Sequence, residues 1–357
     1  RARREREESE KRARRERERG DRGARKDQKR TNMATFGAAP SSPPAVENYL
    51  NRMQHSGSFI MKSKPMNNPS TPVGSVLGAV EELQIPMLAG PTFPHPKPED
   101  FDFMEPGEVI LENVIVKTGA KDDPIGLTRA GPRERVLFKG EDTRIGILTC
   151  GGLCPGLNTV IQGIVCDSHF EYNVPEGNVL GIRGGFRGFS DPELWPPLVL
   201  TEKSVSNIHN LGGTILGSNR GGFEAPKVVD KMVEMQLDQL YCIGGDGTHA
   251  AAMLLTEEIR RRGLKIAVVG VPKTIDNDIM VIDRSFGFDT AVQEAVKAIK
   301  CARIEASACL HGIGIVKVMG RSCGYLAAHA ALASRDVDIC LIPEVEFDME
   351  GPGGLIA

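Results

Sequence analysis

The chain has 357 residues, of which 40% are hydrophobic, 25% are charged and 5% are aromatic, and 40 are glycine. This length allows two domains, and the composition is that of an ordinary globular protein. The formal net charge of -3 gives no overall positive field to attract nucleic acid, so we expect no nucleic-acid partner. Because no apolar run of about 18 residues and no signal-peptide pattern occur, we expect no membrane span and a cytoplasmic location.

Two segments of unusual composition open the chain. Residues 1–32 form a charged leader, in which residues 1–31 contain 15 Lys and Arg against 8 Asp and Glu, and we expect it to be disordered or a loose helix. The first methionine is Met33, and our hypothesis is that residues 1–32 lie upstream of the natural start. Residues 33–106 are rich in Pro and Ser and predict an extended N-terminal arm, because Pro fixes φ and lacks a backbone donor.

Short β-branched runs alternate with amphipathic stretches from about residue 107, and indicate two α/β domains at residues 107–275 and 276–357. We expect strands at residues 144–149, 179–182, 240–243, 266–271, 313–318 and 337–342. Helices are expected at residues 155–165, after residue 248, and at residues 289–305 and 322–333. Strands that are apolar on both faces and alternate with helices predict a doubly wound, mostly parallel sheet, which binds ligands at the carboxyl ends of its strands.

Cysteine and histidine give little sign of metal binding. The chain has 8 cysteines, none of them in a C-x-x-C pair, and we expect buried, reduced thiols because most lie in apolar runs. Cys150 and Cys154 share a loop, and a zinc or redox role there is the alternative. His249 and His311 belong to no metal-spaced cluster, so we expect both to be structural or exposed.

A glycine-rich turn follows the strand expected at residues 240–243: Gly244, Gly245, Asp246, Gly247 and Thr248. Glycines let the backbone approach a phosphate closely, and the start of the following helix supplies positive potential. Asp246 could hold Mg²⁺ directly or through water, and Thr248 could cap the helix or reach a phosphate oxygen. A plain turn with Asp capping the helix is the alternative.

An acidic loop follows the next expected strand and places Asp276 and Asp278 two residues apart, close to Lys273. One carboxylate could take the proton from an attacking hydroxyl, while the other helps to hold a metal and to orient the loop. A turn that uses Asp and Asn for local backbone bonds is the alternative. Two acidic turns at neighbouring strand ends favour a metal–phosphate centre that faces an acceptor hydroxyl.

Arginines lie in glycine-rich loops at several expected strand ends, namely Arg183, Arg187, Arg220 and Arg321. A guanidinium can bind a phosphate dianion through two parallel hydrogen bonds. The sequence has no Walker A loop and no G-x-S-x-G nucleophile elbow. Together, these motifs predict a magnesium-dependent kinase that acts on a small phosphorylated sugar.

The motifs resemble those of the 6-phosphofructokinases, in particular the plant-type ATP-dependent branch. The resemblance runs from about residue 107 to the C-terminus and rests on residues 149–158, 216–220, 244–248, 272–278, 319–321 and 343–344. It implies ATP-dependent, Mg²⁺-dependent phosphorylation of fructose 6-phosphate at its 1-hydroxyl. It also implies the fold of that family and a homo-oligomer, a tetramer. Because the chain stops at Ala357, we expect a truncated chain with an incomplete sugar-binding domain.

The resemblance also implies a role for each matching residue. Asp276 would be the catalytic base, Arg220 would stabilise charge on the transferred group, and Asp246 would hold the metal. ATP would be bound by Gly152, Arg220, Gly221, Gly245, Asp246, Gly247 and Thr248. The sugar phosphate would be bound by Thr274, Ile275, Asp276, Met319, Gly320, Arg321 and Glu344.

Three alternatives remain beside the ATP-dependent enzyme. In the family, pyrophosphate users carry an Asp that would obstruct the α-phosphate of a nucleotide, and Gly247 in its place resembles the ATP users; Lys273 resembles both the pyrophosphate branch and the plant-type ATP branch. NAD kinases and lipid kinases share the glycine-rich turn but lack the combination of residues 274–278 with residues 319–321. The third alternative is an inactive, truncated chain that docks on full-length subunits and regulates them.

Overall fold

The computed structural model describes residues 81–83, 90–105, 107–111, 125–279, 282–320, 323–351 and 354–355. The charged leader expected at residues 1–32 and most of the arm expected at residues 33–106 lie outside the described residues. Among the helices that are described, none is long and apolar enough to cross a membrane.

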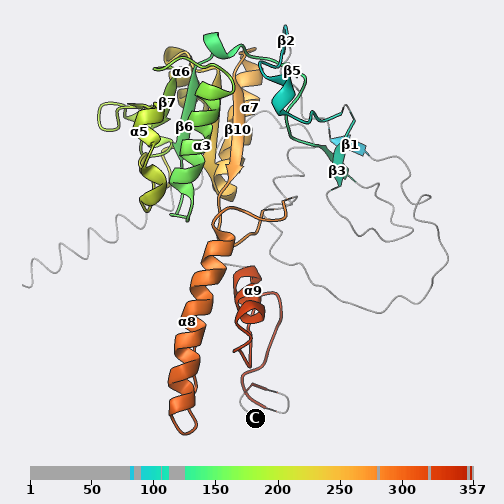
Figure 1. The fold of residues 1–357 in the computed structure, drawn as a ribbon, viewed down its shortest axis with the longest axis vertical. Coiled ribbons are helices and arrows are strands. Elements are labelled where there is room, and N and C mark those ends of the chain that lie inside the picture. Colours follow the sequence, from blue (N-terminus) through green and yellow to red (C-terminus); the bar gives the residue numbers. More distant parts are fainter. Residues whose placement is uncertain are drawn as a thin grey trace, which may run out of the picture. The chain divides into compact units, whose positions relative to one another are not determined.

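A five-stranded sheet forms the centre of the fold (Figure 1). Its strands are, in order across the sheet, β10 (Ala267–Pro272), β9 (Gln239–Gly244), β6 (Ile145–Thr149), β7 (Val179–Ile182) and β8 (Leu198–Val199). The first four are parallel, and β8 pairs antiparallel with β7 at the edge. All residues of β6 and β7 are buried, as expected for strands that are covered on both faces. The predicted mostly parallel α/β sheet is confirmed.

Helices cover both faces of this sheet, because successive side chains of a strand point to opposite sides. Leu148 of β6 packs in one apolar cluster, with side chains of α4 (Arg187–Ser190), α6 (Ala225–Glu234) and α7 (Asp246–Arg261). Ile147, the preceding residue, packs in the other. That second cluster contains side chains of α3 (Leu157–Phe170), α5 (Glu202–Val205) and the 3-10 helix η4 (Ile208–Asn210).

Smaller elements precede the main sheet. The strands β1 (Glu81–Leu83), β4 (Ile125–Thr128) and β3 (Val109–Leu111) form a three-stranded sheet, and β2 (Phe93–Pro94) pairs with β5 (Arg135–Val136). Two short 3-10 helices, η2 (Pro98–Asp100) and η3 (Gly140–Asp142), lie in the same part of the chain. The arm was expected to be extended rather than a packed unit, and most residues of 90–105 are exposed, although His95 in this segment is only 4% exposed.

After the sheet, the chain forms two helices that pack against each other, α8 (Phe288–Ala308) and α9 (Tyr325–Ser334). The strands predicted at residues 313–318 and 337–342 are wrong, since both segments are irregular. Ile313 and Ile315 are 85% and 86% exposed, and among the described residues no strand lies beside them to complete their backbone hydrogen bonds. The predicted α/β domain at residues 276–357 therefore has helices but no strands in its described part.

Candidate active site

Backbone hydrogen bonds bring three loops together at the carboxyl edge of the sheet, where β6, β9 and β10 end. The amide of Cys150, after β6, donates to the carbonyl of Ile243 in β9 at 2.9 Å, and Lys273 N, after β10, donates to Gly244 O at 2.9 Å. The loop that contains Asn219 joins them, because Gly151 N donates to Asn219 O at 3.2 Å. The glycine-rich turn and the acidic loop are thus neighbours, as the parallel sheet predicts.

Lys273 ties two of these loops together from the inside. The residue is 6% exposed, and its Nζ donates a hydrogen bond to Gly152 O at 2.7 Å. Burial lowers the pKa of this amine, while the nearby Cys154, Cys150 and Asp276 act to raise it. The head of the exposed Arg220 lies close by, with Nη2 3.7 Å from where a Cβ on Gly152 would stand. Two cationic side chains therefore flank the Gly152 loop.

The turn at residues 244–248 leaves room for a ligand at one glycine but not at another. A Cβ on Gly244 would stand 2.1 Å from Oγ1 of Thr248, whereas a Cβ on Gly247 would meet no atom within 4 Å. Thr248 itself is 6% exposed. The N-cap residue of α7 is Gly245, which makes no side-chain cap, and the capping suggested for Thr248 and Asp246 stays a prediction. The open face of the turn lies at Gly247.

Asn277 closes the acidic loop into a tight turn. Its backbone has φ of 53°, a left-handed conformation that Asn tolerates better than most residues. Its Nδ2 donates to Asp283 O at 3.0 Å, and its Oδ1 accepts from Ser285 N at 2.7 Å. Thr274 Oγ1 accepts from Asp276 N at 3.1 Å. The local backbone bonds suggested as an alternative are present, and they fix the position of Asp276.

The carboxyl group of Asp278 is affected by the charges of both acidic turns. The pKa of Asp278 is raised, first because the carboxyl is partly buried, and then because the charges of Asp246 and Asp276 disfavour a further negative charge. Its Oδ1 is buried and has no hydrogen-bond partner among the described residues. Such an arrangement favours a bound cation, which would relieve the repulsion and satisfy the oxygen.

Segments that contain residues predicted to hold the sugar phosphate lie close to Asp276, so far as they are described. A Cβ on Gly320 would stand 4.0 Å from Asp276 Oδ1, and Cys323 Sγ donates to Asp276 O at 3.1 Å. Glu344 Oε1 accepts from the amide of Gly324 at 2.7 Å, while Oε2 is buried without a partner. Met319 is 76% exposed.

For two residues of that predicted set, the structure does not place the side chain at the predicted sugar-phosphate site. Ile275 is partly buried and packs on an apolar cluster of the sheet, so its contact with a sugar would have to come from the backbone. Arg321 lies outside the described residues. Cys323 was not predicted as a site residue, because no motif spacing indicates its hydrogen bond to Asp276 O. The link from Lys273 to Gly152 was also not predicted, since a lysine in a loop is ordinarily exposed.

The remaining sequence candidates have structural explanations. His249 is structural as expected, because its Nδ1 bonds to Gly245 O at 3.0 Å. His311 is exposed. Arg183 lies over the ring of Trp195, with 5.9 Å from Cζ to the ring centroid, which is a cation–π contact within the fold. Arg187 is exposed, and its Cγ would lie 2.5 Å from a Cβ on Gly222.

All eight cysteines are free thiols, but the expectation that they are buried holds only in part. Cys150, Cys154 and Cys242 are buried, whereas Cys301, Cys309 and Cys340 are exposed and correct the expectation. Burial raises the pKa of both Cys150 and Cys154 to about 11, so both are protonated at neutral pH. In the described part of the chain no group of three His, Cys, Asp or Glu could hold a metal, which leaves zinc at this loop unsupported.

The geometry defines a doubly wound α/β protein. Its glycine-rich turn and its acidic loop meet at the carboxyl edge of the sheet. The profile of the family described as Phosphofructokinase matches residues 144–354. The chain therefore belongs to the phosphofructokinase family, as the motifs at the carboxyl edge led us to expect.

Curated relatives agree with this assignment. Over 293 residues, the chain is 48% identical to ATP-dependent 6-phosphofructokinase 1 from Arabidopsis thaliana, covering 80% of this chain and 60% of that protein. ATP-dependent 6-phosphofructokinase 7 from the same plant is 48% identical over 82% of this chain and 60% of its own length. The chain thus spans about 60% of the length of these relatives.

A solved structure, the pyrophosphate-dependent phosphofructokinase from Marinobacter aquaeolei, is 21% identical with a TM-score of 0.45. The match covers 58% of this chain and 51% of that one.

Proposed function

We propose that this chain carries the phosphoryl-transfer centre of an ATP-dependent 6-phosphofructokinase, which phosphorylates fructose 6-phosphate at its 1-hydroxyl. The proposal rests on one observation above all: the bond from Lys273 N to Gly244 O, at 2.9 Å, makes the loop that carries Asp276 the neighbour of the turn that carries Asp246. Phosphoryl transfer needs a metal beside the donor phosphates and a base beside the acceptor hydroxyl, within reach of each other. The names of the curated relatives support the choice of donor and acceptor.

In this mechanism Asp276 accepts the proton of the 1-hydroxyl as the hydroxyl oxygen attacks the terminal phosphorus of ATP, and the bond from that phosphorus to the bridging oxygen breaks to release ADP. The turn that Asn277 closes holds Asp276 in place, so little reorganisation is needed at the moment of transfer. Arg220 neutralises charge that spreads over the oxygens of the transferred group. Lys273 is held beside the Gly152 loop by its bond to Gly152 O.

The residues present fit a magnesium ion. Asp246 and Asp278 would hold it, and the unpartnered, buried Oδ1 of Asp278 is the observation that favours a cation here. Mg²⁺ is ordinarily bound by one or two carboxylates together with phosphate oxygens and water, so a larger protein ligand set is not required. When bound, the ion supplies positive charge on the donor phosphates.

The two substrates take opposite sides of Asp276 in this proposal. ATP is held by residues of the loops after β6 and β9 and of the loop that carries Arg220, namely Gly152, Arg220, Gly221, Gly245, Asp246, Gly247 and Thr248. Fructose 6-phosphate is held by Thr274, Ile275, Asp276, Met319, Gly320, Arg321 and Glu344. The nucleotide-binding domain is residues 107–275, and the sugar-binding part is residues 276–357.

Gly247 supports ATP over pyrophosphate as the donor. Because a Cβ at this position would meet nothing within 4 Å, the space beside the turn is open to the α-phosphate of a nucleotide. An Asp side chain would fill that space and bring a negative charge next to the phosphate.

A product assay with the purified chain tests the function. We expect fructose 1,6-bisphosphate from fructose 6-phosphate with Mg²⁺ and ATP, and at least tenfold less with pyrophosphate, about 1.4 kcal/mol of discrimination. Faster transfer from pyrophosphate would establish the pyrophosphate-dependent alternative. Nucleotide binding without product from either donor would favour the regulatory alternative. The same assay on a chain extended to the length of the relatives shows whether missing sequence limits the rate.

We further propose a homotetramer in the cytoplasm, in line with the resemblance to the family. Sedimentation equilibrium gives the oligomeric state directly. A fluorescent fusion tests the cytoplasm against the chloroplast, because two relatives from Arabidopsis thaliana, ATP-dependent 6-phosphofructokinases 4 and 5, are named chloroplastic.

A further inference from the structure

A small cavity of about 160 Å³ lies away from the carboxyl edge of the sheet. Its lining includes Thr143, Asp238 and Lys265, which stand just before the strands β6, β9 and β10 begin. These strands are parallel, so the cavity is at their amino ends and the candidate active site is at their carboxyl ends. The two sites are therefore distinct.

Charged groups of both signs line this cavity without pairing. Lys139 and Lys265 contribute two cations, and Asp142 and Asp238 contribute two carboxylates. All four line one small cavity, yet among the described residues none of them takes part in an ion pair. Asp238 Oδ2 accepts one backbone hydrogen bond, from Arg144 N at 2.8 Å, and no bond to the carboxylate of Asp142 occurs in the described part.

Aromatic rings hold the two cations in place. Lys139 Nζ lies 4.9 Å from the ring centroid of Phe93, and Lys265 Nζ lies 5.0 Å from that of Phe138. Both rings also line the cavity. A cation–π contact orients an ammonium but leaves its remaining N–H groups able to bind an acceptor. The cavity thus has oriented donors, free carboxylate oxygens and an apolar surface.

We propose that this cavity binds a small zwitterion of the α-amino acid class. The ammonium of the ligand lies at Asp142 and Asp238, its carboxylate lies at Lys139 and Lys265, and a small apolar side chain contacts the phenyl rings. A simple anion would meet two carboxylates and a simple cation would meet two ammonium groups, so a ligand of both signs fits best.

Size and exposure limit the ligand and its affinity. The cavity has the volume of about five water molecules and is open to solvent on one side, so it suits a small ligand such as alanine, serine or valine. Lys139, Lys265 and Asp142 are exposed, so solvent weakens each charge contact. We therefore expect dissociation constants of about 1 mM rather than micromolar values.

Titration calorimetry with L-alanine, L-serine and L-valine tests the proposal on the whole chain. Propionate and propylamine serve as matched ligands that lack one charge, and inorganic phosphate serves as a simple anion. Lys139→Gln and Asp142→Asn each remove one charge from the cavity. Lys203→Gln and Asp102→Asn make the same changes at exposed positions outside it.

We expect saturable binding of at least one amino acid, at least tenfold tighter than binding of propionate, propylamine or phosphate. Each cavity variant should weaken this binding at least tenfold, and the two control variants should leave it unchanged. The absence of saturable binding up to about 50 mM would overturn the proposal. So would equal binding of phosphate or propionate, which would make the cavity an anion site, or unchanged binding in the cavity variants.

Discussion

At the scale of single residues, two glycines of one turn differ in the space that is left for a side chain. Gly244 packs against the side chain of Thr248, which leaves no room for a Cβ, while Gly247 faces open space. The sequence shows both only as members of a glycine-rich motif. Their separate effects on folding and on ligand binding follow from the structure.

Gly244→Ala tests the packing of the turn. Its added methyl would stand within 2.7 Å of three atoms of Thr248, so we expect the free energy of unfolding to fall by about 2 kcal/mol. Urea denaturation measures this change. Gly247→Ala is the matched control, because the same methyl meets nothing there, and an equal loss in both variants would contradict the described turn.

Gly247→Asp tests the choice of donor. Since the position is open, we expect unchanged thermal stability, together with a loss of ATP affinity of at least tenfold, about 1.4 kcal/mol. Fluorescence titration with a labelled ATP analogue measures the affinity. Tight ATP binding by a well-folded Gly247→Asp protein would rule out the argument from space and charge.

Much of the candidate site could be predicted from residue types, because glycine-rich and acidic turns after apolar strands follow simple rules. These rules alone predict that Asp246 and Asp276 lie near each other. They could not show that Lys273 bonds to Gly152 O, or that Thr248 faces inward. Both depend on which way a side chain turns after distant loops have met.

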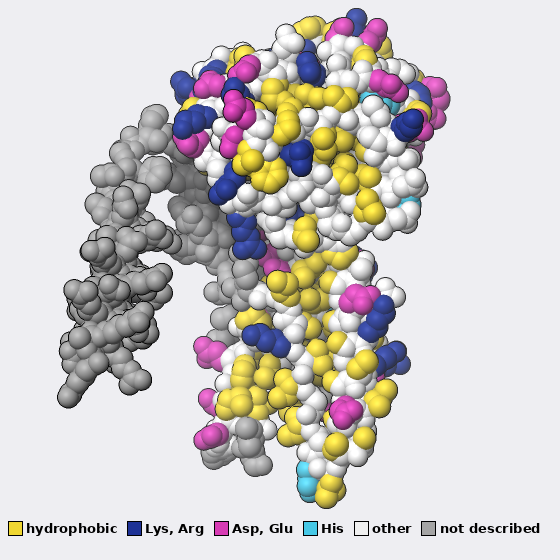
Figure 2. Space-filling model, turned by 90° about the vertical axis from the view of Figure 1, so that its left-hand side faces the viewer, with side chains coloured by type: hydrophobic (Ala, Val, Ile, Leu, Met, Phe, Trp, Pro, Cys, Tyr) yellow, Lys and Arg dark blue, Asp and Glu magenta, His cyan; other side chains and the backbone are white. Residues whose placement is uncertain are grey.

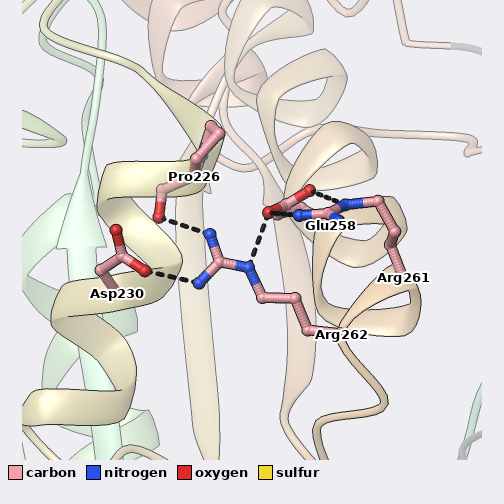
Figure 3. A network of polar contacts seen from close by, with 5 residues as sticks. All are labelled: Pro226, Asp230, Glu258, Arg261 and Arg262. Carbon is pink, nitrogen blue, oxygen red and sulfur yellow. Dashed lines mark hydrogen bonds and ion pairs between the residues drawn. The ribbon is translucent and has the colours of Figure 1, made fainter. Parts of the chain in front are cut away.

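At the scale of elements, one arginine joins two helices on the same face of the sheet (Figure 3). Arg262 follows α7, and its guanidinium bonds to Asp230 and to the carbonyl of Pro226 in α6 and to Glu258 in α7. Glu258 also accepts two bonds from Arg261 at 2.7 Å. These bonds to Arg261 and Arg262 lower the pKa of Glu258 to about 2.

This network predicts a pH dependence of stability. The pKa of Glu258 is lower in the folded chain than its ordinary 4.5, so its contribution is complete above pH 4.5 and is lost as the pH falls towards 2. Between about pH 5 and 3, we expect the wild type to lose about 1 kcal/mol more than Glu258→Gln does. Denaturant unfolding at several pH values measures the difference. Glu193→Gln, at an exposed position, is the control and should follow the wild type.

His95 anchors the segment before the main sheet. Its ring centroid lies 4.7 Å from that of Phe101 and 5.4 Å from those of Phe103 and Tyr172, and its Nδ1 accepts a hydrogen bond from Lys97 N at 3.2 Å. The buried ring fastens residues 90–105 to the domain.

We expect His95→Ala to destabilise this attachment by about 2 kcal/mol and to speed proteolytic cleavage within residues 90–105 at least tenfold. Limited proteolysis followed by mass spectrometry measures the rate at each site. His209→Ala, at an exposed histidine, is the matched control. Cleavage at the wild-type rate would mean that His95 does not hold the segment.

The main elements of the sheet were predictable because each strand is a short apolar run. The strands predicted at residues 144–149, 179–182, 240–243 and 266–271 match β6, β7, β9 and β10 within a few residues. The short edge strand β8 was missed, since Leu198–Val199 is too brief to show a pattern, and the amphipathic helix α6 was also not predicted. The strands predicted at residues 313–318 and 337–342 failed for another reason, as apolar runs become strands only with partners.

At the scale of the whole molecule, apolar side chains are distributed unevenly. Many lie exposed on α8, α9 and the residues that follow each helix, in the lower half of Figure 2. They include Ile304, Leu310, Ile313, Ile315, Met319, Leu332, Ile339 and Val345. An apolar surface of this kind marks a contact surface or a site of aggregation. A structure of the proposed tetramer would have to account for this exposed apolar surface.

In the proposed function, two acidic turns meet at one metal–phosphate centre, with Asp246 at the metal and Asp276 at the acceptor. Electron paramagnetic resonance of Mn²⁺–ATP, with Mn²⁺ in place of Mg²⁺, tests it most directly. We expect Asp246→Asn to weaken Mn²⁺–ATP binding at least tenfold, about 1.4 kcal/mol, while Asp276→Asn and the exposed control Asp102→Asn stay within twofold of the wild type. Wild-type affinity for Mn²⁺–ATP in Asp246→Asn would contradict the claim.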